Sequence, residues 1–180
     1  MRHFILLVLF STISVHSQSF FQAYQDQKGV QFLSVNPMMF RLLGQMDLQS
    51  NDPETTAYLV MIKSIRSFKV LVTEEADIAA SLTKTVRDWV SNENMELLLQ
   101  LEETDNILRF YAELGEDEIH VKRLLMFSKG KGLENAIRIQ GKKLQSVLLF
   151  LEGNINLELV GRLTEVMDLP GGDQLKKIHK

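Results

Sequence analysis

The sequence has 180 residues, of which 45% are apolar and 24% are charged, and this composition excludes a disordered chain, a collagen-like repeat and a coiled coil. With 20 basic and 23 acidic residues the net charge is −3, so no basic excess favours binding to nucleic acid. The absence of cysteine excludes a disulfide scaffold, a thiolate zinc site and a cysteine nucleophile.

The first 17 residues predict a secretory signal peptide. A short basic start precedes an apolar run from Phe4 to Phe10, and small or β-branched residues follow up to Ser17. The apolar run is shorter than the roughly 20 residues that span a bilayer, and no cysteine follows that could carry a lipid anchor. We therefore expect an exported, periplasmic or secreted protein, cleaved after Ser17. Residues 18–180 should form one domain without a stable membrane anchor, ending in a short basic tail at 173–180.

The first half of the mature chain is mainly helical in pattern. Phe20, Phe21 and Tyr24 fit one side of a short helix, and residues 30–35 form a β-prone run. Asn36 followed by Pro37, and Asp52 followed by Pro53, are helix-start signals, because the first residue can cap and proline suits the first turn. Residues 68–72 predict a strand. Thr73 is then expected to cap a third helix, with an apolar stripe of Ala79, Leu82, Val86, Trp89 and Val90.

The second half changes to a period of two. Residues 95–101 and 108–114 alternate in polarity on either side of a polar turn, which predicts a hairpin, and 119–127 predicts another strand. Residues 144–151 are nearly all apolar, as expected of a central strand covered on both sides and closed by Gly153 and Asn154. Asn156 should cap a last helix.

Helices before strands indicate an α+β domain rather than an alternating α/β fold. We expect a mostly antiparallel sheet of about five to six strands, with three to four helices packed mainly on one face.

Few residues are available for chemistry. The mature chain keeps only His120 and His179, whereas a catalytic zinc usually takes three protein ligands. His120 could act as a general base, but its place in a strand beside Lys122 favours a solvent-facing side chain. The acidic turns near residues 102–105 and 113–118 lack the spacing of a calcium loop. We expect no catalytic, cofactor-binding or metal-ligating residue and no cofactor.

The order of motifs resembles the bacterial family called domain of unknown function 4252. The matching segments are N-P-M-M-F at 36–40, D-P-E at 52–54, K-V-L-V-T-E-E at 69–75, Q-S-V-L-L-F-L-E-G-N-I-N-L at 145–157 and L-P-G-G at 169–172. The resemblance implies a small exported protein, often lipid-anchored in the family, although this sequence lacks the anchoring cysteine. It implies no activity and no catalytic residues. Some members are encoded near sigma-factor and anti-sigma genes, which implies a link to envelope sensing.

Three functions remain open at this stage. The first is a non-catalytic binding or accessory module of the bacterial envelope, which would hold a partner protein or a second copy through an exposed mixed sheet face formed by Ile107, Arg109, Tyr111 and Glu113. The second is an envelope hydrolase that works through the turn carboxylates Glu113, Asp117 and Glu118. The third is a carrier of a lipid or other apolar ligand, with a cavity along residues 144–151.

Overall fold

The computed structural model describes residues 16–45, 52–103, 106–117, 119–130 and 144–166. Most of the expected signal peptide, the segment 131–143 and the basic tail lie outside these ranges. Helix α1 (His16–Gln25) begins just before the expected cleavage point after Ser17. None of the helices in the described ranges has the length and apolar character needed to cross a membrane.

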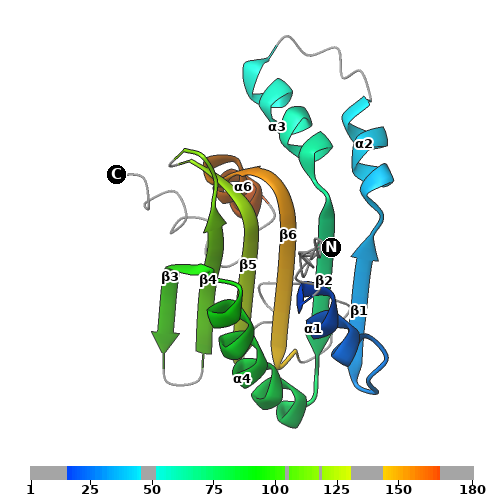
Figure 1. Ribbon diagram of the computed structural model, residues 1–180, viewed down its shortest axis with the longest axis vertical. Coiled ribbons are helices and arrows are strands. Elements are labelled where there is room, and N and C mark those ends of the chain that lie inside the picture. The colour runs from blue at the N-terminus through cyan, green and yellow to red at the C-terminus, as the bar shows by residue number, and fades with distance from the viewer. Residues whose placement is uncertain (1–15, 46–51, 104–105, 118, 131–143, 167–180) are drawn as a thin grey trace, which may run out of the picture.

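Six strands form one sheet in which every neighbouring pair is antiparallel (Figure 1). The spatial order is β1-β2-β6-β5-β4-β3, so the last of the described strands in sequence is inserted between β2 and β5. The sheet and the helices described below confirm the expected α+β class. The strands are β1 (Val30–Val35), β2 (Ser67–Thr73), β3 (Glu96–Glu103), β4 (Asn106–Leu114), β5 (His120–Gly130) and β6 (Ser146–Asn156).

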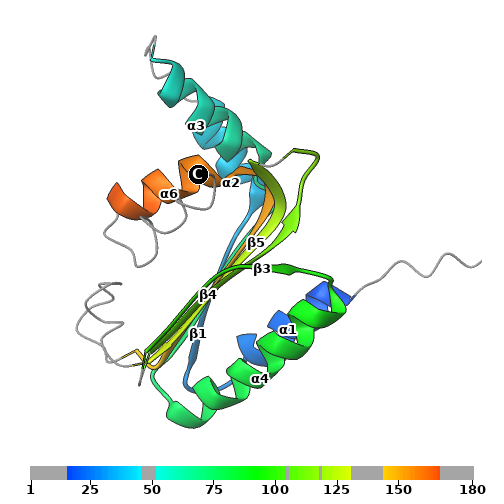
Figure 2. The same ribbon diagram turned by 90° about the vertical axis from the view of Figure 1, so that its left-hand side faces the viewer.

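Helices lie on both faces of the sheet (Figure 2). Helix α1 and the long helix α4 (Ala76–Asn92) cover one face, and α6 (Leu157–Val166) together with the end of α3 (Pro53–Ser64) covers the other. Helix α2 (Pro37–Gln45) packs beside α3, and the two project past the end of the sheet. The described residues thus contain five helices, and the expectation of three to four helices mainly on one face needs correcting.

The reason for two helical layers lies in β5 and β6, whose apolar residues alternate between the faces without a polar side. We call the apolar cluster between the sheet and helices α1 and α4 the α4-side core, and the one between the sheet and helices α3 and α6 the α6-side core. Leu125 and Leu148 belong to the α4-side core, while Leu124 and Val147 belong to the α6-side core. Because both faces of these strands are apolar, both must be covered. The expectation for 144–151, a central strand buried on both sides, is confirmed. The α4-side core also holds Phe20, Phe21, Tyr24, Ile78, Leu82, Val86, Trp89, Val90, Met95, Tyr111, Phe127, Phe150 and Leu71.

Local capping sets most helix starts. The side chain of Asn36 accepts a hydrogen bond from the backbone N–H of Met38 at 2.9 Å. The side chain of Asp52 accepts one from the backbone N–H of Thr55 at 2.9 Å, and that of Asn156 accepts one from the backbone N–H of Glu158 at 2.9 Å. These three expected starts are confirmed. Thr73 is different: it ends β2, its hydroxyl donates to the carbonyl of Gly29, and α4 begins only at Ala76.

Gly153 does not close β6, as the sequence suggested, because the strand continues to Asn156. Because glycine has no side chain, the backbone at the end of α3 can approach the backbone of β6 closely at this position. A Cβ at this position would lie 2.8 Å from the carbonyl oxygen of Ser64 and 3.1 Å from the Cα of Ile65. Glycine therefore lets the end of α3 rest directly on β6.

Candidate functional site

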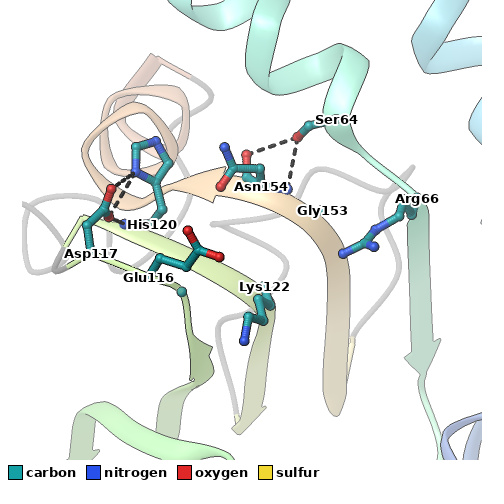
Figure 3. Close-up of a pocket in the computed structure, with 9 residues that line it drawn as sticks. Ser64, Arg66, Glu116, Asp117, His120, Lys122, Gly153 and Asn154 are labelled. Atoms are coloured by element: carbon teal, nitrogen blue, oxygen red, sulfur yellow. Dashed lines mark hydrogen bonds and ion pairs between the residues drawn. The ribbon is translucent and has the colours of Figure 1, made fainter.

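A pocket of about 600 Å³ lies at the end of the sheet, where the turn between β4 and β5 faces the junction of α3 with β2 (Figure 3). We call it the rim pocket. Most of its lining residues are polar or charged, and they come from three separate parts of the chain: the α3–β2 junction, the β4–β5 turn with the start of β5, and β6. The lining residues are Ser64, Arg66, Gly115, Glu116, Asp117, His120, Lys122, Gly153 and Asn154.

Asp117 and His120 form a pair at one side of the rim pocket. The Asp117 carboxylate accepts hydrogen bonds from the backbone N–H groups of Ile119, at 3.1 Å, and His120, at 2.7 Å. It also contacts Nδ1 of the His120 ring at 2.8 and 2.9 Å. The hydrogen bond from this ring is the main reason why the pKa of Asp117 lies below its usual value, and the two backbone bonds act in the same direction. An ionised Asp117 makes Nδ1 the donor and turns Nε2 away from the carboxylate.

This geometry revises the expectation for His120. The residue begins β5 and is held by Asp117 rather than simply facing solvent beside Lys122. The missed signal is the spacing D-x-x-H across a turn, in which the acid organises the backbone and orients the histidine three residues later.

Ser64 and Asn154 join α3 to β6 at the floor of the rim pocket. The Ser64 hydroxyl lies 2.6 Å from the carbonyl oxygen of Met61 and 2.9 Å from that of Asn154, and it accepts a hydrogen bond from the backbone N–H of Asn154 at 3.0 Å. The hydroxyl is therefore engaged with backbone groups on both sides. Its role here is to fix the junction rather than to act as a nucleophile.

Two cations of the rim pocket, Arg66 and Lys122, make only long ion pairs. Nε of Arg66 is 3.8 Å from Glu152, Nζ of Lys122 is 4.0 Å from Glu113, and both cationic side chains are more than half exposed. Exposed pairs of this kind contribute little to stability. The rim pocket therefore presents positive and negative groups to solvent together.

Two of the three carboxylates named for a hydrolase, Glu113 and Asp117, each have other partners. Glu113 is bound by Arg123, and both oxygens of Asp117 serve its turn and His120, while Glu118 lies outside the described residues. No cluster of three or more potential metal-ligating His, Asp or Glu side chains occurs within the described ranges.

The sheet face expected to be open is covered. Tyr111 is only 8% exposed and packs in the α4-side core, and Arg109 is mostly buried and contacts Glu102 at 3.4 Å. Helix α4 therefore covers part of the face named for a partner, and binding of a partner or a second copy through this face stays a prediction. The apolar strand 144–151 likewise packs into the two cores, whereas the residues that line the rim pocket are mostly polar or charged.

A group of exposed apolar side chains lies on α2. Met38, Met39, Leu42 and Leu43 are 44–53% exposed, and their spacing places them on one side of the helix. We call these four residues the α2 stripe. The opposite side is occupied, because Phe40 packs against Phe68 with ring centroids 5.9 Å apart. The sequence signal that was missed is the excess of apolar residues, which is too large for one buried face of a nine-residue helix.

Comparison with known proteins adds a family but no activity. A family model described as "Domain of unknown function (DUF4252)" matches residues 24–163. No curated protein and no solved structure matches the chain.

Proposed function

Since the chain belongs to the DUF4252 family, whose description names no activity, we propose from its geometry a non-catalytic binding and accessory module of the bacterial envelope. It is exported by its signal peptide, acts in the periplasm or outside the cell, and serves envelope sensing or signalling. It holds a partner protein through the α2 stripe.

The α2 stripe is the observation that carries this proposal. Four large apolar side chains stand side by side in solvent on a helix that is anchored from behind by Phe40. Val60 of the neighbouring helix α3 is also 60% exposed. Contiguous apolar surface of this kind on a soluble domain marks an interaction site. A short helix presenting residues i, i+1, i+4 and i+5 suits an apolar groove in another protein.

Charge favours a protein over a lipid surface as the occupant. Helix α2 contains one cation, Arg41, and the whole chain has a net charge of −3. Helices that lie on anionic membranes usually carry several lysines or arginines on their polar side. The α2 stripe lacks that attraction, so its apolar contacts must be made with protein.

The first experiment compares three forms of the protein as bait in envelope extracts of the producing bacterium. The parent protein and Leu97→Lys, a change at an exposed leucine of the distant strand β3, should retain the same partner. Leu42→Lys should lose it, because a charge in the α2 stripe cannot enter an apolar groove. Equal retention by Leu42→Lys, or retention of no partner by the parent, would refute the proposal.

Export has its own test. Protein recovered from the periplasm or the medium should begin at Gln18 when its N-terminus is sequenced. Recovery of a chain that still begins at Met1, or recovery only from the cytoplasm, would contradict export by a cleaved signal peptide.

A further inference from the structure

The two edges of the sheet differ in a way that bears on assembly. Among the described strands, β1 forms one edge and pairs only with β2, and β3 forms the other edge. The sequence of β1, V-Q-F-L-S-V, contains no charged residue and no proline, and its Leu33 is 54% exposed. An uncharged, exposed edge strand offers unpaired backbone groups to another strand.

The opposite edge is protected against pairing. Strand β3 includes Glu96 and Glu102, and its register with β4 is interrupted by an irregularity between Leu97 and Leu99. Acidic side chains and bulges are the usual devices that prevent two sheets from joining edge to edge. Because one edge is guarded and the other is not, edge pairing is directed to β1.

We propose that β1 pairs with β1 of a second copy of this chain, antiparallel and centred on Leu33, to form a continuous twelve-stranded sheet. This surface is separate from the α2 stripe, so the proposal does not depend on the proposed function. If a two-fold axis perpendicular to the sheet relates the two copies, one residue of β1 must lie opposite the same residue of the second copy. Centring on Leu33 places Leu33 opposite Leu33 and thereby buries the most exposed apolar side chain of the strand.

The side chains of β1 match their own copy in this register. Val30 and Phe32 pack on the α4-side core, so Leu33 faces the other side of the sheet. On the α4 side, the large Phe32 of each copy then lies opposite the small Ser34 of the other. No like charges meet at any position, because the strand has none. This self-complementarity favours a second copy over the strand of an unrelated protein.

The interface is short, so the dimer should be weak. Six residues of edge pairing bury less surface than a stable dimer usually needs. We expect a dissociation constant in the micromolar range, with monomers at about 1 μM and dimers at about 200 μM in sedimentation velocity. A parent protein that stays monomeric up to the higher concentration would overturn the proposal.

A cysteine variant tests the register directly. The parent chain has no cysteine, so Leu33→Cys carries a single thiol that can form a disulfide only with another copy. Leu97→Cys is the matched control, since Leu97 is an edge-strand leucine that is 49% exposed. Under mild oxidation the disulfide dimer should form at least about ten-fold faster from Leu33→Cys, because pairing raises the local thiol concentration. Equal rates for the two variants would overturn the proposal.

Leu33→Lys supplies the complementary result. A lysine at the two-fold axis would face the lysine of the second copy, so the dimer should weaken at least about ten-fold. The circular dichroism spectrum should stay that of the parent, because the side chain is exposed in the monomer. Unchanged dimerisation of a folded Leu33→Lys protein would also count against the proposal.

Discussion

Arg123 joins three elements through its guanidinium group. Arg123 lies on β5, and its Nη1 is 2.6 Å from the carboxylate of Glu93, the residue that follows α4. Its Nη2 donates a hydrogen bond to the backbone carbonyl of Glu93 at 3.1 Å. Its Nε contacts the carboxylate of Glu113 on β4. The side chains of Arg123 and Glu93 are each only 16% exposed. Burial alone lowers the pKa of Arg123, but the hydrogen bonds and charges of the two glutamates more than reverse this effect. The cluster fastens the end of α4 to the sheet.

Replacing Arg123 with methionine should destabilise the fold. Arg123→Met keeps the length of the side chain but leaves Glu93 and Glu113 without their cation, and we expect the free energy of unfolding to fall by about 2–4 kcal/mol. Urea denaturation followed by circular dichroism measures the change. Lys84→Met is the control, because the Lys84–Asp88 pair, at 2.8 Å, is exposed and should leave the midpoint unchanged. Equal midpoints for both variants would contradict the role given to Arg123.

Asp117 links stability to acid pH. Its pKa is lowered in the folded protein, chiefly by the hydrogen bond from His120, so the unfolded chain binds the proton more readily. The corresponding stability is present above about pH 4 and is lost as the pH falls through the lowered pKa. Asp117→Asn should therefore flatten the decline of the urea midpoint between about pH 5 and pH 2. Glu116→Gln removes a charge from the same turn, and an equal flattening in that variant would show that Asp117 has no special part.

At the scale of elements, the junction of α3 with β6 depends on Gly153. The backbones of Ser64, Ile65 and Gly153 approach so closely that no side chain fits between them. The junction also forms the floor of the rim pocket, so its spacing sets where Ser64 and Asn154 lie.

Gly153→Ala should separate α3 from β6. The added methyl group would meet backbone atoms, which cannot rotate away as a flexible side chain can, and we expect a loss of about 1–3 kcal/mol in the free energy of unfolding. Thermal denaturation provides the measurement. Asn154→Ala is a matched control, because the contacts of Asn154 with Ser64 use backbone atoms that alanine retains. A Gly153→Ala protein as stable as this control would contradict the close-packing argument.

Elements governed by neighbouring residues could be predicted from the sequence. The caps at Asn36, Asp52 and Asn156 act within three residues, and the apolar pattern of β6 already required burial on both sides. Contacts between distant segments could not be predicted. Whether Met38 is covered depends on what packs beside α2, and the rim pocket joins Ser64 to Asp117 and Asn154 across the fold.

At the scale of the whole molecule, the two cores are coupled through shared strands. Strands β4, β5 and β6 each supply buried residues to both cores. If one helical layer left the sheet, it would expose apolar residues of the same strands that support the other layer. We therefore expect the described fold to unfold in one cooperative transition.

Trp89 makes this expectation measurable. It is the single tryptophan and lies in the α4-side core, whereas Ile155 is buried in the α6-side core. Ile155→Ala should lower the free energy of unfolding by about 2–4 kcal/mol. The Trp89 fluorescence and the far-ultraviolet circular dichroism should shift together in urea. A fluorescence midpoint that stays at the parent value while the dichroism midpoint moves would show that the two layers unfold separately.

The position of β6 also has a consequence for the order of folding. Within the part of the chain that the structure describes it is the last strand in sequence, yet it lies between β2 and β5 and pairs with both along most of its length. Until β6 emerges, the paired strands β1 and β2 share no strand pairing with the three strands β3–β5, and each group keeps an open inner edge. The sheet is therefore completed by its final strand, after long-range pairing that slows folding. A nascent chain that stalls before residue 146 would hold two unjoined half-sheets that are prone to pair with other chains.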